Sequence, residues 1–182
     1  MEKFKSRKRL FCNVFGVVDV ALVRELIARI EAIPAAEDVE VCLRINSQGG
    51  SVPVALAFAG YLKSLPHRVV AINMAQCDSA AMIIYSAAEE RIVLKSASFM
   101  FHQPFVHLNG KFTVHDLNAE LKRLKKDAKN MLEFLSKMLS IEQIRLAEWM
   151  EGGERVFSAR QALRVGIATV INPGTGVSKG TS

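Results

Sequence analysis

The chain has 182 residues, of which 50% are hydrophobic, so it can bury one substantial core and suits a single domain. Lysine and arginine outnumber aspartate and glutamate by 24 to 18, and this moderate formal charge of +6 permits nucleic-acid binding without requiring it. Three widely spaced cysteines, Cys12, Cys42 and Cys77, form no Cys-x-x-Cys pair, which favours neither a disulfide framework nor a zinc site. We therefore expect a protein of the reducing cytoplasm.

The N-terminal segment is basic over residues 3–9 and apolar over 10–18, as in a secretory signal. Asn13 and Asp19 interrupt it, and no small-x-small cleavage site follows closely, so the pattern favours a first core strand. No apolar run approaches the ~20 residues needed to cross a bilayer. We expect a protein that is soluble and has no membrane partner.

Hydrophobic periodicity predicts an alternation of strands and helices over the first hundred residues. The expected strands are 10–18, 39–45, 69–74, 91–94 and 97–103, and the expected helices are 20–33, 52–64 and 79–88. Asp19 is a suitable N-cap for the first helix. This order is typical of βαβ units in a mostly parallel sheet, where ligands collect at the points at which strands end and helices begin.

A long charged helix is predicted over residues 114–139, after a turn at Asn109-Gly110. Its apolar positions fall three or four residues apart: Leu117, Leu121, Leu124, Ala128, Met131, Leu135 and Met138. The basic residues between them lack interleaved aromatics, so a solvated face explains them better than nucleic-acid binding does. Because the stripe is longer than a compact core needs, we expect it to contact another subunit.

The C-terminal part is expected to hold a helix over 141–150, a helix over 159–165 and a strand over 168–171. Ser158 and Gln161 form a capping box for the second helix, which Gly166 ends. The Gly/Ser/Lys-rich tail over 173–182 is expected to be disordered.

The stretch 71–84 is where we expect the chemistry, with Ser79 at its centre. A serine at a strand-to-helix junction lies beside free backbone N–H groups, which stabilise negative charge and suit a nucleophile. The simpler interpretation is that Asp78 or Ser79 caps the helix.

Two further segments supply what a nucleophilic serine needs. Gly49 and Gly50 follow a strand and allow the backbone to approach a ligand with its N–H groups exposed. His102 ends an apolar strand just before Pro104 and is the candidate general base. The N–H groups of Gly50 and Ala80 are the candidate oxyanion donors.

Four segments together resemble the ClpP family, the proteolytic subunits of Clp-type serine proteases. They are residues 45–51 (INSQGGS), 76–81 (QCDSAA), 100–104 (MFHQP) and 157–162 (FSARQA), and the resemblance runs from about residue 10 to 171. It implies an α/β crotonase-like spiral of ββα units, with a head over about 10–104 and 151–172 and a strand-plus-long-helix handle over about 105–150.

By position, the resemblance implies Ser79 as nucleophile, His102 as general base, Gly50 and Ala80 as oxyanion donors, and Glu154 as the acid that orients His102. Glu154 stands where the family has aspartate, and Ala80-Ala81 stands where the family usually has methionine and glycine. The family assembles as two stacked seven-membered rings, cleaves peptides or unfolded polypeptide, and needs no metal or cofactor in this subunit. Because this sequence begins near the family's first core strand, the resemblance leaves an ATPase unfoldase partner undecided.

Three alternatives remain beside a Ser-His-acid peptidase. Glu154 and the residues after Ser79 also suit a catalytically impaired ring or scaffold subunit. An acyl-CoA enzyme of the crotonase fold would share the oxyanion hole and use acidic residues. A Ser–Lys dyad would use Lys95 or Lys111.

Overall fold

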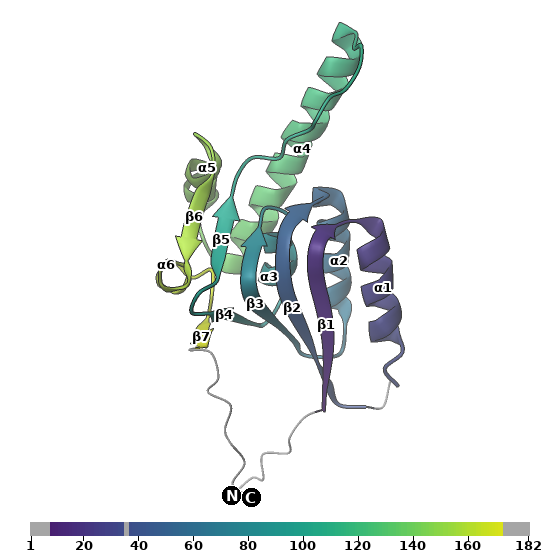
Figure 1. Cartoon of the computed structure of the whole chain (residues 1–182), viewed down its shortest axis with the longest axis vertical. Coiled ribbons are helices and arrows are strands. Elements are labelled where there is room, and N and C mark those ends of the chain that lie inside the picture. Colours follow the sequence, from purple (N-terminus) through teal and green to yellow (C-terminus); the bar gives the residue numbers. More distant parts are fainter. Residues whose placement is uncertain (1–7, 35–36, 173–182) are drawn as a thin grey trace, which may run out of the picture.

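The computed structural model describes residues 8–34 and 37–172. The basic residues 3–7 and the predicted tail over 173–182 lie outside this part of the chain. A twisted sheet forms the centre, with the first two helices on one side and a long helix extending beyond the body (Figure 1).

The strands are β1 Lys8–Val18, β2 Val39–Gly50, β3 Val69–Asp78, β4 Glu90–Leu94, β5 Ser98–Phe101, β6 Arg155–Ser158 and β7 Val170–Asn172. They pair in the order β1-β2-β3-β4-β7, all parallel, as the βαβ pattern predicted. The sheet divides along β3: its residues 70–73 pair with β4, whereas residues 76–78 pair with β5. Strand β5 then pairs antiparallel with β6. The end of β3 therefore lies between the two branches.

The helices are α1 Val20–Glu31, α2 Val52–Ser64, α3 Ala81–Ser86, α4 Val114–Leu139, α5 Gln143–Met150 and α6 Ala159–Arg164. The predicted bounds of α2 and α4 are confirmed. Asp19 caps α1 by accepting a hydrogen bond from Leu22 N at 2.8 Å, and Ser158 and Gln161 form the predicted capping box.

The sequence prediction was wrong on two elements near the site. The predicted helix over 79–88 is shorter, because β3 continues to Asp78 and α3 begins only at Ala81. Strand β6 was not predicted, because its four residues have only one buried side chain, Phe157, and therefore carry little periodic signal.

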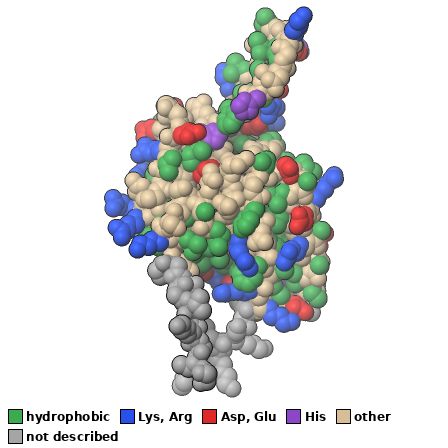
Figure 2. All heavy atoms as spheres, in the orientation of Figure 1, with side chains coloured by type: hydrophobic (Ala, Val, Ile, Leu, Met, Phe, Trp, Pro, Cys, Tyr) green, Lys and Arg blue, Asp and Glu red, His purple; other side chains and the backbone are tan. Residues whose placement is uncertain are grey.

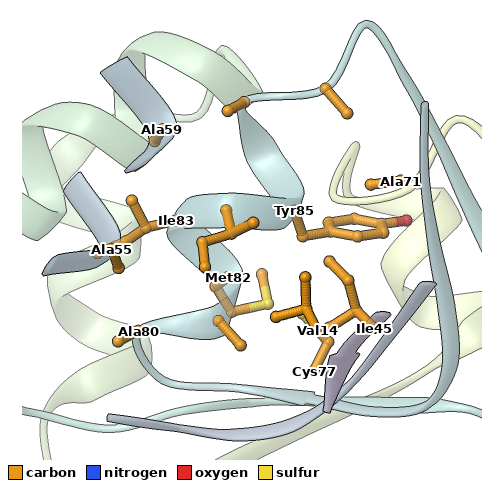
Figure 3. Close-up of a cluster of buried hydrophobic side chains, with 14 of the residues drawn as sticks. Val14, Ile45, Ala55, Ala59, Ala71, Cys77, Ala80, Met82, Ile83 and Tyr85 are labelled. Atoms are coloured by element: carbon orange, nitrogen blue, oxygen red, sulfur yellow. The ribbon is translucent and has the colours of Figure 1, made fainter. Parts of the chain in front are cut away.

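The core packs around α3, whose six residues are all buried (Figure 3). Tyr85 and Met82 from this helix lie among Val14 of β1, Ile45 of β2 and Cys77 of β3. Small residues of α2, Ala55 and Ala59, allow that helix to pack closely on the same cluster. This packing explains why α3 needs no polar face, and it anchors the turn that precedes the helix.

Helix α4 has two different halves. Its C-terminal half packs on the body, with Met131 and Leu135 fully buried, whereas Leu117 and Leu121 are 45% and 49% exposed on the part that projects (Figures 1 and 2). The preceding residues 105–113 form no strand with any other described segment, so the strand of the expected handle is not present in this single chain.

Candidate active site

Ser79 occupies a strained turn between β3 and α3. Its φ of +52° is in the left-handed region, which costs a non-glycine residue energy and is typical of functional sites. Two backbone bonds hold it there: Ser79 N donates to Met100 O at 2.9 Å, and Met82 N donates to Ser79 O at 3.0 Å. The simpler interpretation of this serine is wrong, because Ala80 is the N-cap of α3 and neither Asp78 nor Ser79 caps it through a side chain.

The glycine segment at the end of β2 lies directly against this turn. A Cβ atom at Gly49 would lie 2.8 Å from both Asp78 O and Ser79 Cβ, and its φ of +94° also favours glycine. The Ser47 hydroxyl donates to Gly16 O at 2.6 Å and accepts from Gly49 N at 3.1 Å, which fixes the segment. The two glycines therefore bring the backbone into contact with the serine.

One backbone N–H group beside Ser79 is available to a ligand. Among the described residues, Ala80 N donates no hydrogen bond, since it precedes the helix and lies beyond the strand. A free N–H donor next to a nucleophile can stabilise an oxyanion. Because the donor is already oriented, binding the oxyanion requires little reorganisation of the protein. Ala80 itself is fully buried, so only its N–H group could take part.

His102 follows β5 and is partly buried. Its Nδ1 lies 2.7 Å from Gln103 O. A carbonyl oxygen only accepts hydrogen bonds, so in this contact Nδ1 carries the hydrogen and a neutral ring leaves Nε2 unprotonated. That tautomer is the one a general base requires. No hydrogen bond joins the His102 and Ser79 side chains within the described chain.

One cleft of about 400 Å³ brings these groups together. Ser79, Gly49, Gly50 and His102 line it, together with the start of α2 and two charged residues of α4, Arg123 and Asp127. Histidine side chains lie where the projecting part meets the body, as Figure 2 shows. The strand ends predicted to meet thus form one concave site.

Comparison with known proteins identifies the family of this chain. The profile described as Clp protease matches residues 6–173. The chain belongs to the Clp protease family. ATP-dependent Clp protease proteolytic subunit 4 of Rhodococcus jostii is 28% identical over 158 residues, which are 86% of this chain and 78% of that protein.

Other Clp proteins give the same result with different coverage. Proteolytic subunit 3 of Rhizobium meliloti is 32% identical over 56% of this chain, and the match spans about half, 51%, of that relative's length. The solved structure of a ClpP1 point mutant from Listeria monocytogenes superposes with a TM-score of 0.80 at 19% identity, covering 90% of this chain and 91% of that one. This likeness establishes the ClpP fold.

Glu154, the acid that the Clp protease resemblance implies, does not line the cleft of Ser79. It is exposed directly before β6 and lines an adjoining cavity of about 370 Å³ together with His102. Gly152 and Gly153, both with positive φ, precede it. His102 therefore faces the Ser79 cleft and the Glu154 cavity.

Two residues next to Ser79 have altered acidity. Burial raises the pKa of the Cys77 thiol well above its usual value, so Cys77 is not a thiolate nucleophile. Burial also raises the pKa of Asp78, against the lowering effects of Gln76, Met100 N–H and the charge of His102. Gln76 donates to one Asp78 oxygen, while Oδ1 is buried without a hydrogen-bond partner among the described residues.

Sequence reasoning missed Gln103, Arg123 and Asp127. The carbonyl of Gln103 carries no side-chain signal, and Arg123 and Asp127 resemble the rest of the charged face of α4. The sequence offered one signal for Asp127: it is a charged residue that adjoins Leu124 and Ala128, two members of the apolar stripe of the helix. No helix among the described residues is long and apolar enough to span a membrane.

Proposed function

We propose that this chain is a serine endopeptidase of the ClpP type, which hydrolyses peptides or unfolded polypeptide. The observation that carries this proposal is the cleft in which a strained serine, a histidine whose Nδ1 lies 2.7 Å from Gln103 O and the Gly49-Gly50 backbone meet. The catalytic residues proposed are Ser79 and His102, with the N–H groups of Gly50 and Ala80 as oxyanion donors.

The reaction follows acyl transfer through two steps. His102 Nε2 accepts the proton of the Ser79 hydroxyl as its oxygen attacks the scissile carbonyl, and the same proton then passes to the leaving amine. The backbone donors stabilise the oxyanion, each with about 3 kcal/mol. Water, activated by His102, then attacks the acyl-enzyme and releases the second product.

Glu154 is proposed as the acidic partner of His102, reached through the adjoining cavity. In the conformation described, Gln103 O accepts the Nδ1 hydrogen instead, and the ring also packs on Phe105, with the ring centroids 5.3 Å apart. When the His102 ring turns toward the adjoining cavity, the Glu154 carboxylate would replace Gln103 O as the acceptor of the Nδ1 hydrogen. The contribution of Glu154 should then be smaller than that of a buried triad carboxylate.

The exposed half of α4 supports assembly into stacked seven-membered rings. Its apolar side chains, together with Phe105 and Phe112, which are 64% and 40% exposed, need a partner surface. A ring chamber would admit peptides or unfolded segments in the cytoplasm, where the free buried thiols Cys12, Cys42 and Cys77 suit reducing conditions.

A fluorophosphonate probe tests the proposal, because it reacts with activated serines. We expect labelling that Ser79→Ala abolishes and Cys77→Ser retains, with hydrolysis of unstructured fluorogenic peptides lost in parallel. His102→Ala should lower both rates, whereas Lys95→Ala and Lys111→Ala should leave them unchanged. Loss of activity in a lysine variant would favour the Ser–Lys dyad instead. Thioester hydrolysis independent of His102 would favour an acyl-CoA enzyme instead.

A catalytically impaired ring subunit is the second candidate. It is favoured by the exposed position of Glu154 outside the Ser79 cleft and by the lack of a Ser79–His102 hydrogen bond within the described residues. Apo enzymes often hold such bonds too long, so this geometry fits both candidates. An assembled particle that the probe does not label would establish the impaired subunit.

A further inference from the structure

Helix α4 forms part of the wall of the Ser79 cleft and contributes a buried carboxylate to it. Asp127 is only 6% exposed, whereas most charged residues of this helix point to solvent. It lies on the side of α4 that packs on α2 and α3, between Leu124 and Met131. Both Asp127 and Ser79 line the cleft, so a substrate residue held at Ser79 would meet this carboxylate.

The charge of Asp127 is only weakly compensated. Its contact with Arg123 Nη1 measures 3.4 Å, which is long for a charge-assisted hydrogen bond. Arg123 makes its short contacts with Glu120, at 2.9 Å from Nε and 2.7 Å from Nη2. A buried carboxylate with one distant partner gains much from a second cation.

Asp127 and Arg123 differ in solvent exposure. The Asp127 side chain is 9% exposed and the Arg123 side chain 49%, so the carboxylate is fixed by packing while the guanidinium lies at the cleft mouth. Arg123 can retain Glu120 while an incoming cation takes its place beside Asp127. Among the described residues, no other carboxylate lines this cleft.

The remaining walls suit a long basic side chain. Val52, Pro53 and Leu124 offer apolar surface for the methylene stem of lysine or arginine, whose charged end would reach Asp127. A volume of about 400 Å³ is within the range of side-chain and small-ligand sites. An acidic side chain would instead meet the Asp127 charge, and an aliphatic one would leave it uncompensated.

We propose that Asp127 makes the Ser79 cleft selective for substrates with lysine or arginine at the residue whose carbonyl is attacked. This specificity rests on the proposed peptidase function. Arg123 acts as the exchangeable partner that neutralises Asp127 when the cleft is empty.

The test uses fluorogenic peptides that differ only in the residue before the scissile bond: lysine, leucine or glutamate. We expect the highest kcat/KM with lysine, and Asp127→Asn should lower that value by about tenfold or more while changing the leucine value little. Arg123→Gln, which frees Asp127, should keep or strengthen the lysine preference. A preference for leucine or glutamate, or an equal loss on all three peptides in Asp127→Asn, would overturn the proposal.

A binding measurement separates this inference from catalysis itself. Ser79→Ala protein should bind the fluorescently labelled lysine peptide more tightly than the leucine peptide, and Asp127→Asn in the same background should remove the difference. If wild-type protein cleaves no peptide and reacts with no fluorophosphonate, the peptidase function fails while the binding preference still decides the role of Asp127. Equal binding of the lysine and leucine peptides by correctly folded Ser79→Ala protein refutes the proposed role of Asp127.

Discussion

The head of the molecule and the projecting half of α4 differ in whether their apolar side chains are buried within the single chain. In the head, strands β1 to β3 and helices α2 and α3 bury their apolar side chains against one another. On the projecting half, Val114, Leu117 and Leu121 are 76%, 45% and 49% exposed, although they continue the stripe that buries Met131 and Leu135. One helix thus serves an internal core at one end and, in the proposed ring assembly, contacts another subunit at the other. Single-chain packing accounts for the head alone.

The largest effect is expected where the head positions Ser79. Gly49→Ala places a Cβ atom 2.8 Å from Ser79 Cβ and Asp78 O, so the turn must move and peptide hydrolysis should fall by ~10²-fold or more. Gly60→Ala is the matched control, because a Cβ atom in the middle of α2 meets nothing within 4 Å and should leave the activity intact. Equal rates for the two variants would show that the contact does not position the serine.

The two ends of α4 should respond differently to equivalent changes. Leu135→Ala removes fully buried side-chain atoms and should lower the free energy of unfolding by ~2–5 kcal/mol. Leu117→Ser with Leu121→Ser should change the unfolding of the isolated subunit little but shift the sedimentation coefficient toward smaller species. If the double variant sediments like the wild type, the projecting stripe is not the subunit contact.

A region could be predicted from the sequence where its structure depends on neighbouring residues, and could not where it depends on contacts between residues far apart in the chain. The bounds of α2 and α4 follow from local periodicity and from caps such as Ser51 and Thr113, which lie next to the helices they start. The left-handed turn at Ser79 was missed because it depends on Met100 O and the close approach of Gly49, which are far away in sequence. The meeting of Ser79, Gly50 and His102 was predictable from strand-end topology, whereas Asp127 at the cleft depends on how α4 is rotated against the head.

Glu154 gives a smaller expected effect than a typical triad acid. Because Gln103 O already holds the Nδ1 hydrogen of His102, Glu154→Gln should lower kcat by less than about tenfold, compared with the ~10⁴ seen when a buried triad carboxylate is lost. His102→Ala provides the reference for complete loss of the base. A Glu154→Gln loss as large as that of His102→Ala would show that the carboxylate, not the carbonyl, orients the ring in the active particle.

The smallest expected effect is on the pH dependence of thermal stability. It differs in sign between Asp78 in the head and Asp116 at the start of α4. Burial raises the pKa of Asp78 above its usual 3.8, so the folded state binds the proton of this carboxyl more tightly than the unfolded state does. Its ionisation therefore costs stability as the pH rises from about 4 through the raised pKa. Asp78→Asn should raise the Tm by a few degrees at pH 7, with a gain that shrinks as the pH approaches 4.

Asp116 at the start of α4 should show the opposite sign. Hydrogen bonds from Thr113 N and the Thr113 hydroxyl lower the pKa of Asp116, so its contribution is present above the unfolded pKa and is lost as the pH falls through the lowered value. Asp116→Asn should therefore lower the Tm at pH 7 and converge with the wild type in acid. Thermal scans of both variants from pH 8 down to about pH 2 measure the two signs, because the Asp116 contribution is lost only below its unfolded pKa. Parallel curves would contradict the assignment of Asp78 as the penalised carboxylate, because a pKa raised by burial, and further by the nearby Glu154 charge, makes the asparagine variant gain stability relative to the wild type as the pH rises.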